Sequence, residues 1–350
     1  MRANQERGVT TNIILDANVL RAMDDDVCQK LGTGGTRLGA LVEASGLAPL
    51  VAVLRMAAHH KLALEITPGR ALSEFAPARR DQRRRAYEKF VDLVCPGAYC
   101  DTPDSTWTPV TVREGEPPEP EFKDLPLGDR ATLAVSYYSL LQLHLVQERH
   151  SALPSEARFH FYLKEVLKHV GIVAAHEVEI AKICFCDRRR GYSERFNSFA
   201  KDIKANFLER NGHLSQRRRN ILNAARDLSY LRFAQARLDL ARPGERVDPW
   251  LVTLDRKLFR TAEAFHHAML PGGMSGLILA VERPTELQKH EYWRTVDRLT
   301  NALRARRIAE GVATREVPEQ DFLSLIDELE RAIDAMDETF SLPVIALHAS

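Results

Sequence analysis

Residues 12–20 read N-I-I-L-D-A-N-V-L, and this stretch decides the fold. Three apolar residues run directly into Asp16, and the apolar character resumes after Asn18. A short β-branched run that ends in a carboxylate is typical of a buried strand with the acid at its carboxyl end. In open α/β sheets, ligands bind outside that edge of the sheet. The stretch therefore predicts an α/β fold in which Asp16 lies where a ligand would bind, if other parts of the chain supply partner carboxylates.

The composition is that of an ordinary globular protein. The chain has 350 residues, of which 45% are hydrophobic and 28% are charged, enough for one large domain or two smaller ones. Its 49 Lys and Arg residues balance 48 Asp and Glu residues, so any nucleic-acid-binding surface would have to be local. The N-terminus lacks the apolar core of a signal peptide, and no apolar run approaches the roughly 20 residues that span a bilayer. We therefore expect a cytoplasmic protein with no membrane contact, whose oligomeric state is unknown.

Other catalytic and metal-binding motifs are weak. The five cysteines include no C-x-x-C pair, which favours reduced structural thiols. A metal cluster of Cys184, Cys186 and His176 is the less favoured alternative. The chain contains no H-E-x-x-H, and residues 272–276 (G-G-M-S-G) do not fit the nucleophile motif G-x-S-x-G.

Three further stretches carry acids in settings like that of Asp16. Residues 62–67 (L-A-L-E-I-T) predict a second strand, followed by a helix that carries Glu74 beside an apolar stripe. Residues 250–255 (W-L-V-T-L-D) predict another strand that ends in an acid, Asp255. The helical pattern that precedes this strand has a regular apolar face, with Asp227 beside it.

Helical patterns account for most of the remaining chain. They are predicted at about residues 38–43, 49–60, 78–93, 130–146, 155–170, 171–184, 192–209, 256–269, 285–311 and 320–339. Residues 277–281 predict a strand, 342–347 an edge strand or docking tail, and 103–126 a Pro-rich acidic loop. In the 192–209 helix, an apolar stripe at helical spacing indicates the core: Phe196, Phe199, Ile203 and Phe207. Basic residues among these rings leave RNA contact as an alternative: Arg188 to Arg190, Arg195, Lys201 and Lys204.

Four acids thus stand at strand ends or on helices next to strands: Asp16, Glu74, Asp227 and Asp255. If they converge, two unit charges about 4 Å apart repel by roughly 4 kcal/mol at an effective dielectric near 20, and a divalent cation would remove that penalty. Carboxylate oxygens suit Mg²⁺ or Mn²⁺, which can also bind a substrate phosphate and orient a water for in-line attack on phosphorus. Near the same edge, Asn18 and Thr253 could hold a water or orient a carboxylate.

This set of motifs resembles the PIN-domain nucleases. The matching stretches, in chain order, are I-I-L-D-A-N-V-L, I-T-P-G-R-A-L-S-E-F, A-R-D-L-S-Y-L-R-F-A and W-L-V-T-L-D-R-K-L, of which the first and last agree best. The resemblance implies a parallel-sheet, Rossmann-like three-layer domain. It also implies that four acids bind Mg²⁺ or Mn²⁺ and cut RNA as an endoribonuclease: Asp16, Glu74, Asp227 and Asp255.

The spacing of the motifs departs from the family pattern. Glu74 and Asp227 are 153 positions apart (227 minus 74), far more than a small PIN domain needs. We therefore expect a domain in two parts, with a helical insertion and a helical C-terminal extension: 10–94 as the first part, 95–215 as the insertion, 216–283 as the second part and 284–350 as the extension. Asp129 is an alternative third acid, less favoured because the helix of Asp227 leads directly into the strand of Asp255.

Three functions remain open from the sequence. The leading hypothesis is a metal-dependent endoribonuclease that hydrolyses RNA phosphodiester bonds. The alternative is a catalytically weak or inactive PIN-like scaffold that binds RNA, or a protein partner through the insertion. A structure-specific DNA nuclease would share the chemistry, but the chain has no recognisable DNA-binding module.

Overall fold

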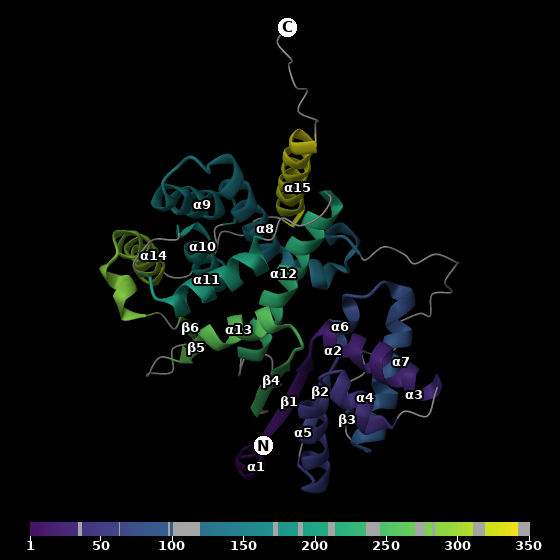
Figure 1. Ribbon diagram of the computed structural model, residues 1–350. Coiled ribbons are helices and arrows are strands. Elements are labelled where there is room, and N and C mark those ends of the chain that lie inside the picture. Colours follow the sequence, from purple (N-terminus) through teal and green to yellow (C-terminus); the bar gives the residue numbers. More distant parts are fainter. Residues whose placement is uncertain are drawn as a thin grey trace. The chain divides into compact units, whose positions relative to one another are not determined.

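The chain forms two compact units in the computed structural model (Figure 1). The structure describes residues 1–33, 37–62, 64–96, 99–100, 120–170, 174–187, 192–208, 214–235, 246–269, 277–281, 284–310 and 319–341. Met1–Asp124 and Tyr230–Phe259 make up the first unit, called the sheet unit here. Leu125–Ser229 and Arg260–Ser350 make up the second, the helical unit.

The sheet unit is built on a parallel sheet with the strand order β3-β2-β1-β4. Its strands are β1 (Val9–Leu15), β2 (Leu64–Thr67), β3 (Tyr99–Cys100) and β4 (Arg246–Val252). The chain runs from β1 outward through β2 to β3 and then returns to the other side of β1, so the strand order reverses between β1 and β4. Strands were predicted at β1 and β2, and β3 was not predicted. The strand expected over residues 250–255 is wrong in its bounds, because β4 ends at Val252, before Asp255. This small parallel sheet in a mostly helical chain is compatible with the expected α/β class.

Consecutive apolar residues explain why β1 lies inside the unit. Ile13, Ile14 and Leu15 are all buried, as expected for a parallel strand that is covered on both faces. The covering core draws on the helices between the strands, including Leu54 and Tyr87. The helices of this unit are α1 (Arg2–Glu6), α2 (Ala17–Arg21), the π-helix η1 (Ala22–Cys28), α3 (Gln29–Thr33), α4 (Leu38–Ala44), α5 (Ala48–His59), α6 (Gly69–Ser73), α7 (Pro77–Val94) and the 3₁₀ turn η2 (Phe122–Asp124).

The helical unit is a bundle in which α8 packs against α9, α10 and α15, and α14 packs against α9. Its elements are α8 (Leu127–Arg149), α9 (Ser155–Val170), α10 (Ala175–Phe185), α11 (Glu194–Phe207), the antiparallel strands β5 (Phe265–Met269) and β6 (Leu277–Val281), the 3₁₀ turn η3 (Thr285–Lys289), α14 (Glu291–Glu310) and α15 (Glu319–Ser341). Two helices contribute residues to both units, α12 (Leu214–Gln235) and α13 (Arg256–Ala264).

Two features of the helical unit differ from the expected organisation. The helix expected over residues 256–269 is wrong beyond Ala264, because residues 265–269 form β5 and pair with β6 rather than with the parallel sheet. The C-terminal helices α14 and α15 pack on α9 and α8, so they share a unit with the residues expected to form an insertion. The chain passes from one unit to the other after residues 124, 229 and 259, whereas the sequence placed boundaries after residues 94, 215 and 283.

Four cysteines of the described chain are free and buried: Cys28, Cys95, Cys184 and Cys186. Burial raises the pKa of the Cys184 thiol to about 12, which keeps it protonated at neutral pH. No helix in the described ranges is both long and apolar enough to cross a bilayer. Several predicted features lie outside the described residues: most of the 103–126 loop, Arg188 to Arg190, residues 272–276 and residues 342–347.

Candidate functional site

Asp16 lies where the strand order reverses, immediately after β1. Its backbone N–H donates to the Val252 carbonyl at 3.1 Å, which extends the pairing of β1 with β4 by one bond. Its side chain caps α2, because Oδ1 accepts a hydrogen bond from the Asn18 backbone N–H at 2.8 Å. Asp16 is only 4% exposed. A buried acid therefore stands at the carboxyl edge of the sheet, between the two strands where open α/β sheets bind ligands.

Thr253 joins Asp16 to Asp255. The Thr253 hydroxyl donates to Oδ2 of Asp16 and accepts from the Asp255 backbone N–H at 2.9 Å. Asp255 lies three residues beyond β4 and caps α13, where its Oδ1 accepts from the backbone N–H groups of Lys257 at 2.6 Å and Leu258 at 3.2 Å. Within the described chain, Oδ2 of Asp255 has no hydrogen-bond partner. One oxygen of Asp255 is thus committed to the helix, and the other can accept a ligand.

The Asp16 carboxyl has a pKa above its ordinary value, chiefly because burial disfavours the ionised form. The hydrogen bonds from Thr253 and Asn18 lower the pKa, the negative charge of Asp255 raises it, and the positive charge of Arg21 lowers it. The rise in the pKa caused by burial and by Asp255 is larger than the fall caused by the two hydrogen bonds and by Arg21. A further positive charge at this edge would therefore stabilise the ionised form.

Arg21 is a member of the site that the sequence did not predict. Its Nη1 donates to Oδ1 of Asn18 at 3.1 Å, and its guanidinium lies 5.3 Å from the centroid of the Phe75 ring. Arg21 follows Asn18 by one helical turn, and this i, i+3 spacing was the available signal. Asn18 thus contacts Asp16 through its backbone and Arg21 through its side chain.

The sequence suggested that Glu74 lies within a helix. In the structure it is the C-cap of α6, just beyond the helix. It is half-buried and accepts a hydrogen bond from the Tyr230 hydroxyl on α12. Arg80 holds the backbone on both sides of it, because Nε donates to the Phe75 carbonyl at 2.6 Å and Nη2 donates to the Ser73 carbonyl at 3.0 Å. The chain around Glu74 is therefore held in place by side chains of α7 and α12.

The last turns of α12 contact α6 a second time, since the Arg70 guanidinium lies 3.1 Å from the centroid of the Phe233 ring. Tyr230, like Phe233, belongs to the third of the motifs that suggested the family, although only Asp227 was singled out there. Aromatic residues one and two turns after Asp227 were the signal that α12 contacts another helix.

The remaining candidate acids lie in the helical unit. Asp227 is half-buried on α12, one turn before Tyr230. Asp129 lies in the first turn of α8, where the helix dipole favours a negative charge without any catalytic role. The structure brings Asp16, Thr253 and Asp255 together, and it places Glu74 against Tyr230. Whether Asp227 or Asp129 completes the set stays a prediction.

The donor set at Asp16 and Asp255 fits a hard divalent cation. Two neighbouring carboxylates supply oxygen ligands, and Mg²⁺ is commonly held by one or two carboxylates together with waters and substrate phosphates. No group of three or more His, Cys, Asp or Glu side chains in the described ranges is placed to hold one metal ion. A cation at this edge would have Asp16 and Asp255 as its carboxylate ligands in the described chain, and its remaining positions would need other oxygens. Comparison of the chain with known protein families, curated proteins and solved structures gives no match.

Proposed function

We propose that this protein is a metal-dependent endoribonuclease that hydrolyses RNA phosphodiester bonds at the Asp16 edge of the sheet. The observation that carries the proposal is that Thr253 joins two acids, Asp16 and Asp255, at the edge of the sheet where the strand order reverses. Burial and the charge of Asp255 raise the pKa of Asp16 there. The resemblance to PIN-domain nucleases supports RNA as the substrate and gives the fold as PIN-like.

The residues of the chain have distinct roles in this proposal. Asp16 and Asp255 hold Mg²⁺ or Mn²⁺, and Asn18 and Thr253 keep the Asp16 carboxylate in one orientation through their hydrogen bonds. When bound, the ion would promote ionisation of a water and stabilise negative charge on the phosphate. Glu74 and Asp227 are the further acids in this proposal. Asp227 lies three residues before Tyr230, the hydrogen-bond partner of Glu74, so Asp227 and Tyr230 belong to the same face of α12.

The test compares wild type with Asp16→Asn and Asp255→Asn on total RNA and on single-stranded DNA, in Mn²⁺ and in EDTA. We expect cleavage of RNA in Mn²⁺ by the wild type only, because each variant loses one negative ligand. Asp92→Asn is the matched control, since Asp92 is exposed on α7 of the same unit. Full activity of both folded variants would refute the proposal. Cleavage of DNA but not of RNA would show that the substrate is DNA.

A PIN-like scaffold that binds RNA or a protein partner without cutting is the alternative. It is favoured by the hydrogen bond that occupies Glu74 and by the absence of a three-acid group in the described ranges. Calorimetry with Mn²⁺ distinguishes the two functions. Uptake that Asp16→Asn abolishes supports the nuclease, whereas RNA binding without Mn²⁺ uptake supports the scaffold. Comparing Asp227→Asn with Asp129→Asn in the same assays identifies the third acid.

A further inference from the structure

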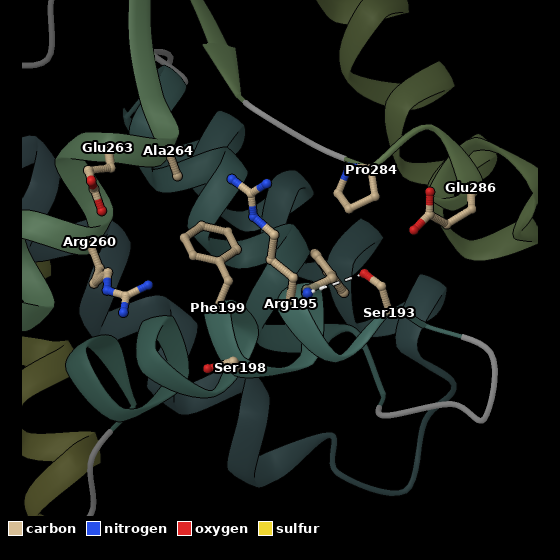
Figure 2. A pocket seen from close by; sticks show the side chains of 10 residues that line it. Ser193, Arg195, Ser198, Phe199, Arg260, Glu263, Ala264, Pro284 and Glu286 are labelled. Atoms are coloured by element: carbon tan, nitrogen blue, oxygen red, sulfur yellow. Dashed lines mark hydrogen bonds between the residues drawn. The ribbon is translucent and has the colours of Figure 1, made fainter.

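The helical unit contains a cavity of about 600 Å³, and none of the acids of the nuclease proposal lines it. Three segments line it: the first half of α11, the last turns of α13, and residues 284–286 at the start of η3 (Figure 2). This volume lies within the range of sites for small molecules and cofactors. The cavity is therefore large enough for a ligand of the size of a nucleotide.

Two arginines and an aromatic ring share this cavity. Figure 2 shows Phe199 between the side chains of Arg195 and Arg260. The Phe199 ring is half-buried, and its centroid lies 6.5 Å from those of the Phe196 and Phe265 rings, which hold it in place. The Arg260 guanidinium has no hydrogen bond or ion pair with any residue that the structure describes. A guanidinium binds phosphate oxygens, and a fixed aromatic ring is a surface on which a nucleobase can stack.

Two carboxylates complete the lining, Glu263 on α13 and Glu286 in η3. Neither side chain has a hydrogen-bond or ion-pair partner in the described chain, although both lie in a cavity that also holds arginines. An ionised carboxylate only accepts hydrogen bonds, so a ligand that forms hydrogen bonds with it presents N–H or O–H groups. Guanine presents two adjacent N–H donors on one edge, adenine and cytosine present an amino group, and uracil presents a single ring N–H.

We propose that this cavity binds a nucleotide unit. Its base packs against Phe199, its phosphate is bound by Arg195 and Arg260, and the N–H groups of the base donate to Glu263 or Glu286. The unit can come from a free mononucleotide or from single-stranded RNA, which share this chemistry. The inference does not rest on the proposed nuclease function, because the site uses none of the residues of the sheet unit.

The experiment measures binding of GMP, AMP, UMP, guanosine and inorganic phosphate to the full chain by calorimetry in EDTA, so that the metal site plays no part. We expect GMP to bind most tightly and UMP most weakly, with guanosine and phosphate each weaker than GMP. Arg260→Gln should weaken GMP binding about tenfold or more, because it removes a charge-assisted hydrogen bond to phosphate. Arg298→Gln is the matched control, since Arg298 is exposed on α14 and does not line the cavity.

The outcomes separate this inference from the nuclease proposal. Asp16→Asn should bind GMP as the wild type does, whatever its effect on cleavage. A single-stranded oligonucleotide that binds more tightly than GMP supports RNA as the source, and equal affinity supports a free nucleotide. The inference is overturned if no nucleotide binds at millimolar concentration, if phosphate binds as tightly as GMP, or if Arg260→Gln leaves the affinity unchanged. Phe199→Leu, which keeps an apolar side chain but removes the ring, should also weaken GMP binding.

Discussion

Burial and the charge of Asp255 both disfavour an ionised Asp16, so the ionisation of this side chain lowers the stability of the folded protein at neutral pH. Its folded-state pKa lies above the ordinary value of 3.8, and the folded state therefore binds the proton more tightly than the unfolded state does. Stability accordingly falls as the pH rises from about 3.8 through the folded-state pKa, and the deficit is complete above it.

Asp16→Asn should remove this deficit, because the amide is neutral and can keep the hydrogen bond from Asn18. In EDTA at pH 7 we therefore expect a midpoint of thermal unfolding above that of the wild type. In a unit of this size, each kcal/mol gained raises the midpoint by about 2–4 °C. The difference should shrink as the pH falls toward 3.8. Mn²⁺ should stabilise the wild type but not the variant. A variant less stable than the wild type in EDTA at pH 7 would contradict this account.

Tyr230 gives a second prediction at a single residue. Its side chain is 3% exposed, and its hydroxyl donates to Glu74. Tyr230→Phe should lower the free energy of unfolding by about 1.5–3 kcal/mol, the usual contribution of a hydrogen bond to a charged group. Urea unfolding measures this loss. An unchanged unfolding midpoint would mean that the Tyr230 hydroxyl does not hold Glu74, and the α12 contact would then rest on Phe233.

The π-helix η1 is the element that connects α2 to the rest of the sheet unit, and one arginine of α7 fixes it. Arg83 is 3% exposed and donates to Asp24 at 3.0 Å and to both oxygens of Asp25, at 2.7 and 2.9 Å. Asp24 is buried as deeply as Arg83 and also accepts a bond from Gln82 at 2.8 Å. Because Asp16 caps α2 and α2 runs directly into η1, this buried ion pair holds the segment that follows Asp16 in place.

Arg83→Met should therefore cost about 3–5 kcal/mol, since it leaves the buried Asp24 without its cation. Arg84→Met is the matched control, because Arg84 is 35% exposed and pairs with Asp81 and Glu88 at the surface, where such pairs contribute about 0–1 kcal/mol. Adding Asp24→Asn to Arg83→Met should recover part of the loss. Equal losses for the two arginine variants in urea unfolding would argue against a buried pair.

Local sequence patterns predict one part of the site better than another. β1 and β4 could be predicted because an apolar run that stops at a polar residue is a local pattern, and Asp16 and Asp255 follow from it. The contact between Glu74 and Tyr230 joins residues 156 positions apart, and no local pattern encodes it. β5 was missed because its sequence, F-H-H-A-M, continues the preceding helical pattern without a break, and only its pairing with β6 makes it a strand.

At the scale of the whole molecule, each unit has a core and a candidate ligand of its own. The large core cluster that contains Ile13 and Tyr87 draws only on residues of the sheet unit. In the helical unit, α8 and α15 enclose Tyr137 and Glu330, which share a hydrogen bond of 2.6 Å. Burial raises the pKa of Glu330, as it does for Asp16 in the other unit. Units with separate cores can unfold separately, and a ligand stabilises only the unit that binds it.

We therefore expect two transitions in calorimetric unfolding of the full chain, each shifted by one ligand. Mn²⁺ should raise the midpoint of the sheet unit, and GMP in EDTA should raise that of the helical unit, by an amount equivalent to about 2.7 kcal/mol at a hundredfold excess over the dissociation constant. Asp16→Asn should abolish the first shift only, and Arg260→Gln should strongly reduce the second only. A single transition that both ligands move equally would show that α12 and α13, which contribute residues to both units, make the chain unfold as one.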